Sequence, residues 1–393
     1  MIKSKKCKIV SILLLLFLVV FYASLVNGCK ERTKSAPKTL KIEDKLKATH
    51  RFNEIDEINK LSNAKRTRPD YLGFSRGVLY LEKNTKDEKF VRTTDQVYKY
   101  DIYKDEVIDI FTVKENIKFM SMNHLDDTLI YSYIDCNNIN NSNIFHYTIA
   151  KFDNNKETVL KEYSFYIDNM SPIFVYQNNK IYFLTIQIDD SQVNDSKIES
   201  GNYDVIQTLY EFNGDDINPV YHLTTQMRDY YPDKNSHYIS STNLYHNLNG
   251  SIAFQEFGEN ENLINIMTNN DITTIKLDDL NDVLLSLVGD EAFVYNSTND
   301  NFRFFNIKTK THRTVGKLER IYEVMNYCDQ YLLFLKEDSN HYYISKDNYS
   351  PTKLKTTDGN NQRSFIFSDG YNIILQVSDL SNDIAKFYIL DKY

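Results

Sequence analysis

The sequence predicts an all-β fold, and three observations support this prediction. From about residue 70 apolar and polar residues alternate, as in Ile181–Ile186 and Lys386–Leu390, which is the period of a half-buried strand. β-Branched and aromatic residues dominate these runs. Clusters of Asn, Asp and Gly separate them, as expected of tight turns between strands. Only residues 51–61 carry the apolar spacing of a helix.

One strand recurs along the chain, each time with an Asn, Asp or Gly turn just before an aliphatic and aromatic run. The seven copies are Gly77–Tyr80, Asp127–Tyr131, Asn179–Tyr182, Gly250–Phe254, Asp290–Tyr295, Asp329–Phe334 and Gly370–Ile374. Spacings of roughly 40 to 50 residues, with one longer gap, are typical of a β-propeller with four-stranded blades. We therefore expect a β-propeller of seven blades. The alternatives are six or eight blades, a pair of β-sandwiches, or another repeat array.

The fifth repeat shows the pattern most clearly, because its four expected strands lie near 280–288, 291–297, 301–308 and 311–317. The last repeat holds only three expected strands before Tyr393. A closed ring leaves no strand edge exposed, so the last blade requires a fourth strand. We expect the segment around residues 48–58 to supply it.

The N-terminal segment has the order of an export signal, with lysines in the first eight residues followed by the apolar run Ile9–Val26. The run ends in Val26-Asn27-Gly28-Cys29, which resembles the lipobox of bacterial lipoproteins. The resemblance implies that the Cys29 sulfur carries acyl chains such as palmitate and that the chain is cut just before Cys29. Two acyl chains hold a protein stably on a bilayer. The resemblance thus implies a lipoprotein of the cell membrane, on its extracytoplasmic face.

The lipobox match departs from the family at Asn27, where a small or aliphatic residue is usual. An uncleaved membrane anchor is one alternative, because the 18-residue apolar run is just short of a comfortable span. Ordinary signal cleavage is another. The chain then divides into a signal peptide or anchor (residues 1–28), a basic flexible tether (29–49) and the propeller domain (50–393).

The charge of the chain is unevenly distributed. Its total is -8, and residues 1–29 and 30–49 each contribute +4, so about -16 remains on residues 50–393. Such a domain repels nucleic acid and anionic lipid. We expect no nucleic-acid partner and a monomeric domain that meets the membrane only through its lipid. Of the two cysteines within the domain, Cys136 and Cys328, idle thiols are favoured over a long-range disulfide.

The longest expected connections indicate a binding surface. Asp189–Asn202, Gln226–His237 and Cys136–Ser142 all emerge on the propeller face that carries the second-to-third and fourth-to-next-first connections. Functional residues concentrate on long loops held by a rigid scaffold. Loops that tolerate insertion without function are the alternative. Because Tyr and Arg are enriched among interface anchors, the candidate binding residues are Arg228, Asp229, Tyr230, Tyr231 and Asp233.

Catalytic motifs give little support for an enzyme. Gly73–Gly77 matches G-x-S-x-G, but a β run follows it directly where a hydrolase has a helix, so a turn is expected. Zinc, Walker, EF-hand and dinucleotide motifs are absent from the sequence. No cofactor is expected, although Asp pairs such as Asp215-Asp216 and Asp278-Asp279 would suit calcium.

The sequence therefore favours a non-enzymatic binding or scaffold lipoprotein. Its partner is a protein or an envelope polymer whose identity the residues do not reveal. One alternative is a metal-dependent propeller enzyme of the cell envelope, lactonase-like or glycan-cleaving. Another is a component of an envelope assembly for sensing or export.

Overall fold

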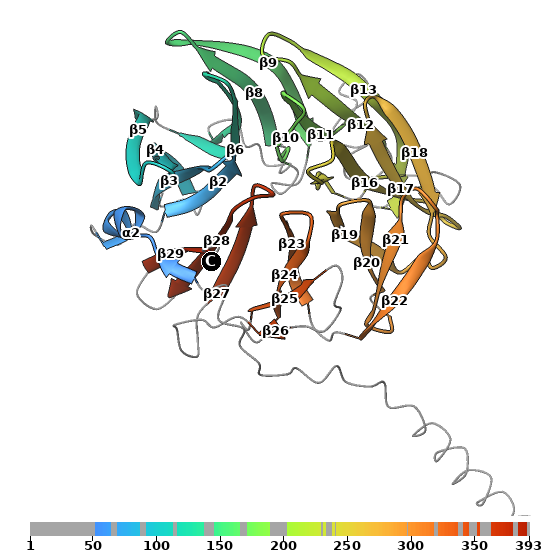
Figure 1. Cartoon of the computed structure of the whole chain (residues 1–393). Coiled ribbons are helices and arrows are strands. Elements are labelled where there is room, and N and C mark those ends of the chain that lie inside the picture. The colour runs from blue at the N-terminus through green and yellow to red at the C-terminus, as the bar shows by residue number, and fades with distance from the viewer. Residues whose placement is uncertain are drawn as a thin grey trace, which may run out of the picture. The chain divides into compact units, whose positions relative to one another are not determined.

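The structure is a computed structural model of the chain, shown in Figure 1. It describes residues 52–63, 69–86, 92–112, 116–136, 145–165, 171–188, 203–228, 231–232, 238–239, 241–296, 298–317, 321–336, 341–345, 352–353, 363–379 and 384–390. The expected signal or anchor segment, the tether and Cys29 lie outside these residues. Within the described residues, no helix has both the length and the apolar character to span a bilayer.

Hydrogen bonding groups the described strands into seven antiparallel sheets, numbered here as blades 1 to 7. Blade 1 holds β2 (Pro69–Ser75), β3 (Val78–Lys86), β4 (Arg92–Asp101) and β5 (Glu106–Thr112); blade 2 holds β6 (Ile117–Leu125), β7 (Thr128–Asp135), β8 (Phe145–Asp153) and β9 (Lys156–Phe165). Blade 3 holds β10 (Val175–Gln177), β11 (Lys180–Ile188), β12 (Tyr203–Phe212), β13 (Ile217–Arg228) and β14 (Tyr231–Pro232). Blade 4 holds β15 (Tyr245–His246), β16 (Ser251–Phe257), β17 (Asn262–Thr268) and β18 (Asp271–Lys276); blade 5 holds β19 (Asp282–Val288), β20 (Glu291–Asn296), β21 (Asn301–Asn306) and β22 (His312–Lys317). Blade 6 holds β23 (Ile321–Tyr327), β24 (Tyr331–Lys336), β25 (His341–Ser345) and β26 (Thr352–Lys353); blade 7 holds β27 (Arg363–Ser368), β28 (Ile373–Asp379), β29 (Ile384–Leu390) and β1 (Phe52–Glu54).

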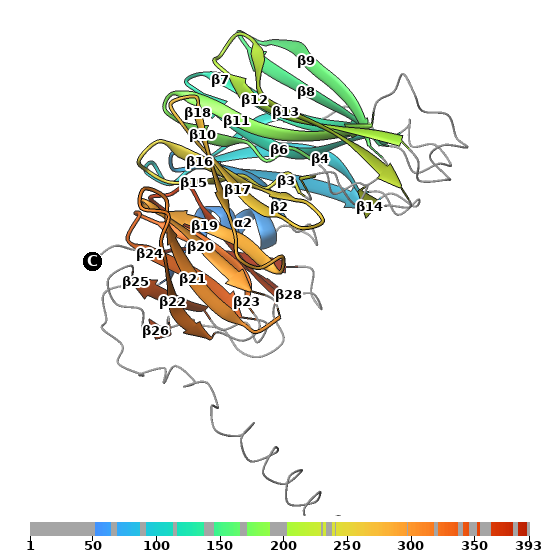
Figure 2. The same cartoon turned by 90° about the vertical axis from the view of Figure 1, so that its right-hand side faces the viewer.

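The sheets follow one another around a common centre, which Figures 1 and 2 show in two views. The first strand of each blade is innermost, and each of these strands contacts the first strand of the next blade, including β27 with β2. The prediction of an all-β propeller with four-stranded blades is therefore confirmed. The recurring strand of the sequence is the second strand of each blade, from β3 to β28.

The N-terminal strand β1 closes the ring. It pairs antiparallel with β29, placing Phe52 opposite Leu390, and so becomes the outermost strand of blade 7. This confirms that the segment around residues 48–58 supplies the missing strand. The helix expected at residues 51–61 begins later than predicted, because α2 spans Asp56–Asn63. Residues Phe52–Glu54 form a strand instead, since they pair with the edge of β29 that would otherwise be unpaired.

Tight turns join the strands within each blade. Asn154-Asn155, Asn178-Asn179 and Asn269-Asn270 all have positive φ at both residues, as a two-residue hairpin of the right twist requires. Arg76-Gly77 has the same conformation, with φ of 51° and 76°. Ser75 is the last residue of β2 and β3 follows the turn, so Gly73–Gly77 is a hairpin and not a nucleophile elbow.

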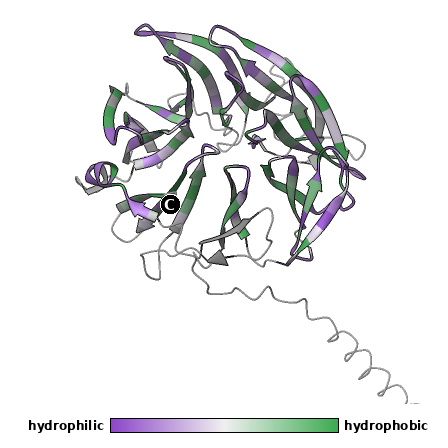
Figure 3. Ribbon diagram, in the orientation of Figure 1, coloured by the Kyte–Doolittle hydropathy of each residue, from purple (hydrophilic) through white to green (hydrophobic). Residues whose placement is uncertain are grey.

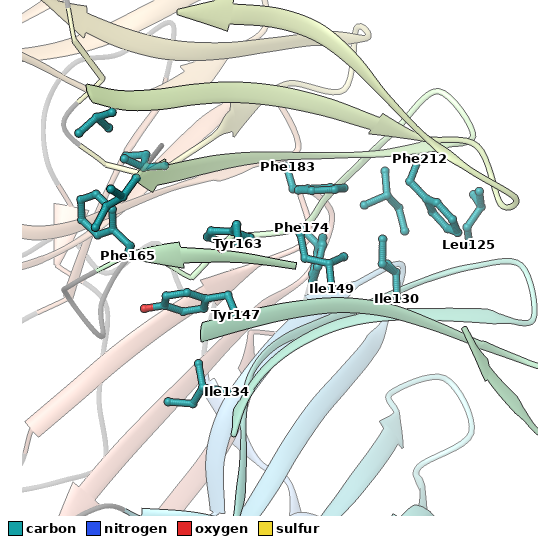
Figure 4. Packing of buried hydrophobic residues seen from close by; sticks show 14 of the residues in the cluster. Leu125, Ile130, Ile134, Tyr147, Ile149, Tyr163, Phe165, Phe174, Phe183 and Phe212 are labelled. Carbon is teal, nitrogen blue, oxygen red and sulfur yellow. The ribbon is translucent and has the colours of Figure 1, made fainter. Parts of the chain in front are cut away.

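The core lies between neighbouring blades. Figure 4 shows the cluster between blades 2 and 3, where Ile149, Phe183 and Phe212 are fully buried. Apolar and polar residues alternate along the strands in Figure 3, and the apolar ones supply these clusters. Burying each large apolar side chain contributes roughly 1.5–3 kcal/mol, so the packed blades form a rigid frame around the centre.

Candidate functional site: a central cavity

A cavity of about 860 Å³ lies at the centre of the ring. Its walls come from the innermost strands of all the blades and from the turns that follow them. Apolar and aromatic side chains that are not fully buried supply much of the lining: Tyr71, Met120, Ile173, Tyr245, Leu285, Met325 and Phe367. The cavity is thus a mainly apolar space of the size that holds ligands in other proteins.

β-Bulges in the innermost strands help to build this lining. The register of β6 shifts between Phe119 and Ser121, and that of β19 between Leu284 and Ser286. The residues left without a cross-strand partner, Met120 and Leu285, both line the cavity. β-Bulges redirect side chains and are common beside binding sites, so here they add apolar residues to the wall.

Ile173 lines the cavity and is 44% exposed. Ile173 precedes β10, and the register of blade 3 places the end of β11 (Ile188) and the start of β12 (Tyr203) toward the same end of the sheet. The connection 189–202 therefore starts and ends on the face where Ile173 lies. We call this the long-connection face.

Two of the predicted binding residues, Arg228 and Tyr231, lie at the same end of blade 3. The structure describes the backbone of Arg228 and Tyr231, which pair with each other between β13 and β14. Residues 226–232 are therefore not one loop, because β13 continues to Arg228 and β14 follows. Asp229, Tyr230 and Asp233 lie outside the described residues, as do the connections 189–202 and 137–144.

The opposite end of the cavity is crossed by hydrogen bonds between turns, and we call it the turn face. The backbone N–H of Leu248, in blade 4, donates to Asp329 Oδ2 of blade 6 at 2.8 Å. Gly370 of blade 7 lies against Leu248, since a Cβ at Gly370 would come within 2.9 Å of Leu248 Cδ2. Three blades therefore meet at this end of the cavity.

Arg76 brings a positive charge to the turn face. Its guanidinium lies 4.3 Å from the centre of the Tyr176 ring, a cation–π contact between blades 1 and 3. It also donates a hydrogen bond to the carbonyl oxygen of His124 at 2.9 Å. Burial, and secondarily the nearby Arg76 charge, lowers the pKa of His124 to about 3. His124 is therefore neutral at neutral pH.

A second histidine lines the cavity near two carboxylates. Burial lowers the pKa of His246, and the negative charges of Asp369 and Asp329 oppose this shift. Asp369 accepts the backbone N–H of Gly77 at 2.6 Å, a bond between blades 7 and 1. Its carboxylate thus helps to connect the two ends of the ring.

Aromatic stacking joins blades 1 and 7 within the cavity wall. Tyr71 and Phe367 have ring centres 3.8 Å apart and planes 5° from parallel. Burial raises the pKa of the Tyr71 phenol above its ordinary value, so it remains a neutral donor. Beside them Glu323 accepts the backbone N–H of Ile366 at 2.8 Å.

The Asp pairs considered for calcium are held by other contacts. Asp279 accepts the backbone N–H of Asn281 at 2.9 Å, and this bond lowers the Asp279 pKa. Asp215 lies 3.8 Å from the Lys151 ammonium. No group of three or more His, Cys, Asp or Glu side chains is placed to hold a metal ion among the described residues. Cys136 and Cys328 are both free thiols.

The apolar residues that line the cavity were not predicted from the sequence. Met120, Ile173 and Leu285 resemble other apolar strand residues, and nothing local marks them as exposed. A usable signal was the repeat itself: the innermost strand precedes each recurring second strand, so its apolar residues are candidates for the channel wall.

No family model matches the sequence, and no curated protein matches it. Solved structures with the same fold include an acylaminoacyl peptidase from Pyrococcus horikoshii, 8% identical with a TM-score of 0.52 over 86% of this chain and 52% of the peptidase. Prolyl oligopeptidase B from Galerina marginata is 9% identical, with a TM-score of 0.51 over 82% of this chain and 49% of that one. YCF48 bound to the D1 peptide is 7% identical, with a TM-score of 0.46 over 84% of this chain and 94% of that one.

The chain spans about half the length of the two peptidases. At these identities the likeness to the two peptidases shows the fold alone. The activity of this chain therefore has to be argued from its own residues.

Proposed function

We propose that this chain is a non-enzymatic binding propeller that takes a segment of a protein or envelope polymer into the mouth of its central cavity. The observation that carries the proposal is the exposed Ile173 in the cavity wall toward the long-connection face. A ring of packed blades that exposes an apolar side chain in a central cavity has the character of a recognition site.

The innermost strands add polar groups to this site. Each is hydrogen-bonded within its blade only to the second strand, as β10 is to β11, so its other edge faces the centre. Such an edge presents backbone N–H and C=O groups. Apolar side chains combined with a few directed polar groups are the usual composition of a binding pocket.

A photo-crosslinking amino acid placed at position 173 tests the binding face. Incorporated in living cells, it should give a discrete covalent adduct with the partner. Ile272 is the matched control, because it is also an exposed isoleucine (37%) but lies on the outer strand β18. No adduct from position 173, or equal adducts from both positions, would contradict the proposal.

We also propose that a lipid on Cys29 holds the propeller at the extracytoplasmic face of the cell membrane. The lipobox-like Val26-Asn27-Gly28-Cys29 supports this proposal. A Cys29→Ser variant should lose incorporation of labelled palmitate and appear in the soluble fraction. Cys7→Ser is the control, since Cys7 precedes the apolar run. Unchanged labelling of the Cys29 variant would refute the lipid anchor.

A further inference from the structure

Two tyrosines stand out on the turn face. Tyr103 lies in the turn between β4 and β5, and Tyr371 lies in the turn between β27 and β28. They are 72% and 54% exposed, the highest values among the exposed large hydrophobic side chains of the described residues. Both belong to the junction of blades 1 and 7, away from the long-connection face.

One carboxylate organises the backbone beneath both rings. Asp369 Oδ1 accepts the N–H of Tyr371 at 3.0 Å, and Asp369 Oδ2 accepts the N–H of Gly77 at 2.6 Å. The Tyr103 ring lies directly against Gly77, because a Cβ there would be only 2.2 Å from Tyr103 Cε2. Glycine at position 77 is thus what lets this ring lie over the hairpin.

Further hydrogen bonds fix Tyr103 from both sides. Asn372 Nδ2 donates to the Tyr103 hydroxyl at 3.2 Å, from blade 7 to blade 1. Asp101 Oδ1 accepts the N–H of Tyr103 at 3.0 Å within its own turn. The Tyr103 ring is therefore exposed and yet held by its surroundings, and the backbone of Tyr371 is fixed by Asp369. Tyrosines ordered before binding lose little conformational entropy when a ligand arrives.

We propose that Tyr103 and Tyr371 form a platform that binds a neutral saccharide chain. The C–H face of a sugar ring packs on the negative face of an aromatic ring. Asn372, Asp101 and Asp369 place amide and carboxylate groups beside the two tyrosines, and such groups bond to hydroxyls. The negative charge of Asp369 disfavours an acidic saccharide, whereas the Asp101 carboxylate is paired with Lys104 at 3.4 Å.

A protein partner fits this surface less well. Stable protein interfaces have an apolar core ringed by polar residues. Here polar residues stand next to both tyrosines in the chain, Asp101 and Lys104 near Tyr103 and Asp369 and Asn372 near Tyr371. Flat apolar faces beside hydrogen-bonding groups suit the surface of a sugar.

Isothermal titration of the full-length protein in detergent tests the proposal. The probes are β-1,4-linked hexasaccharides of glucose and of N-acetylglucosamine. Tyr103→Ala and Tyr371→Ala should each raise the Kd for the bound hexasaccharide by at least about tenfold. Tyr371→Phe keeps the ring and should stay within about threefold.

Leu280→Ala is the matched control, because Leu280 is also exposed (50%) but lies between blades 4 and 5. Failure of the unmodified protein to bind either hexasaccharide would overturn the proposal, as would an unchanged Kd in both tyrosine-to-alanine variants. An equal loss in Leu280→Ala would overturn it too. Tyr371 and Asp369 line the cavity at its turn face, whereas Ile173 lies toward the long-connection face, so Ile173→Asp should leave the hexasaccharide Kd unchanged.

Discussion

Asn59 hydrogen-bonds both main-chain polar groups of Phe387 through its side-chain amide. The N–H of Phe387 donates to Asn59 Oδ1 at 2.8 Å, and Asn59 Nδ2 donates to the Phe387 carbonyl at 3.4 Å. Asn59 belongs to α2, and Phe387 to β29, the strand that pairs with β1. The two ends of the described chain are therefore joined twice, by strand pairing and by a buried side chain.

Replacing Asn59 with alanine should weaken this closure. The change leaves the buried N–H of Phe387 without its acceptor, which costs about 1–3 kcal/mol of unfolding free energy. Urea denaturation followed by circular dichroism measures the loss. Lys60→Ala is the control, because the Lys60 side chain is 67% exposed, and it should change stability by less than about 0.5 kcal/mol. Equal effects of the two changes would show that Asn59 does not secure the ring.

The contact between blades 1 and 2 should not tolerate a larger residue at Gly73. A Cβ at this position would lie 1.9 Å from the carbonyl oxygen of Met122, which is backbone. Gly73→Ala should therefore lower the free energy of unfolding, measured by urea denaturation, by about 1–3 kcal/mol. Adding Met122→Ala should give no rescue, since the clash is not with a side chain. Full rescue by that second change would contradict this account.

A buried ion pair in blade 5 should matter far more than an exposed pair. Asp282 is fully buried and pairs with Arg303, whose side chain is 13% exposed. Asp282→Ala leaves Arg303 with the longer contact to the exposed Asp278 carboxylate, 3.7 Å away, and should lower the free energy of unfolding by about 3–5 kcal/mol. The exposed pair of Lys276 and Glu261 should contribute less than about 1 kcal/mol to the free energy of unfolding. Urea denaturation of a Glu261→Ala variant measures this contribution. Similar losses in the two variants would contradict the role given to burial.

Acid should destabilise the propeller through its buried histidines. The pKa of His124 is lowered to about 3 in the folded protein, whereas an unfolded histidine titrates near 6.5. Between these two pKa values the unfolded state binds more protons than the folded state. The free energy of unfolding therefore falls as the pH drops below about 6.5, and this contribution stops falling near the folded pKa. The slope approaches about 1.4 kcal/mol per pH unit for one histidine whose folded pKa lies this far below its unfolded pKa.

Urea unfolding at several pH values from neutral to acidic tests this prediction. His124→Gln should flatten the decline, because glutamine has no proton to gain. His312→Gln is the control, as the His312 side chain is 43% exposed. An unchanged pH profile in His124→Gln would show that the acid sensitivity arises elsewhere.

The repeat and the turn chemistry were readable from sequence. The copies from Gly77–Tyr80 to Gly370–Ile374 correspond to the second strands of the blades, because a strand with one buried face must alternate and a two-residue turn demands Asn, Asp or Gly. The candidate site was less accessible. Arg228 and Tyr231 were chosen from loop length, and the structure shows them to be paired strand residues.

The sequence by itself determined the strand pattern, the blade repeat and the need for a closing strand from the N-terminus, because these depend on local periodicity and on counting strands. Only the tertiary structure decided which residues meet at the centre. Ile173 and Met120 became cavity residues, and Asp369 came to organise Tyr103 and Tyr371, through contacts between distant blades. Such contacts follow from ring geometry and bulges, which leave no local trace in the chain.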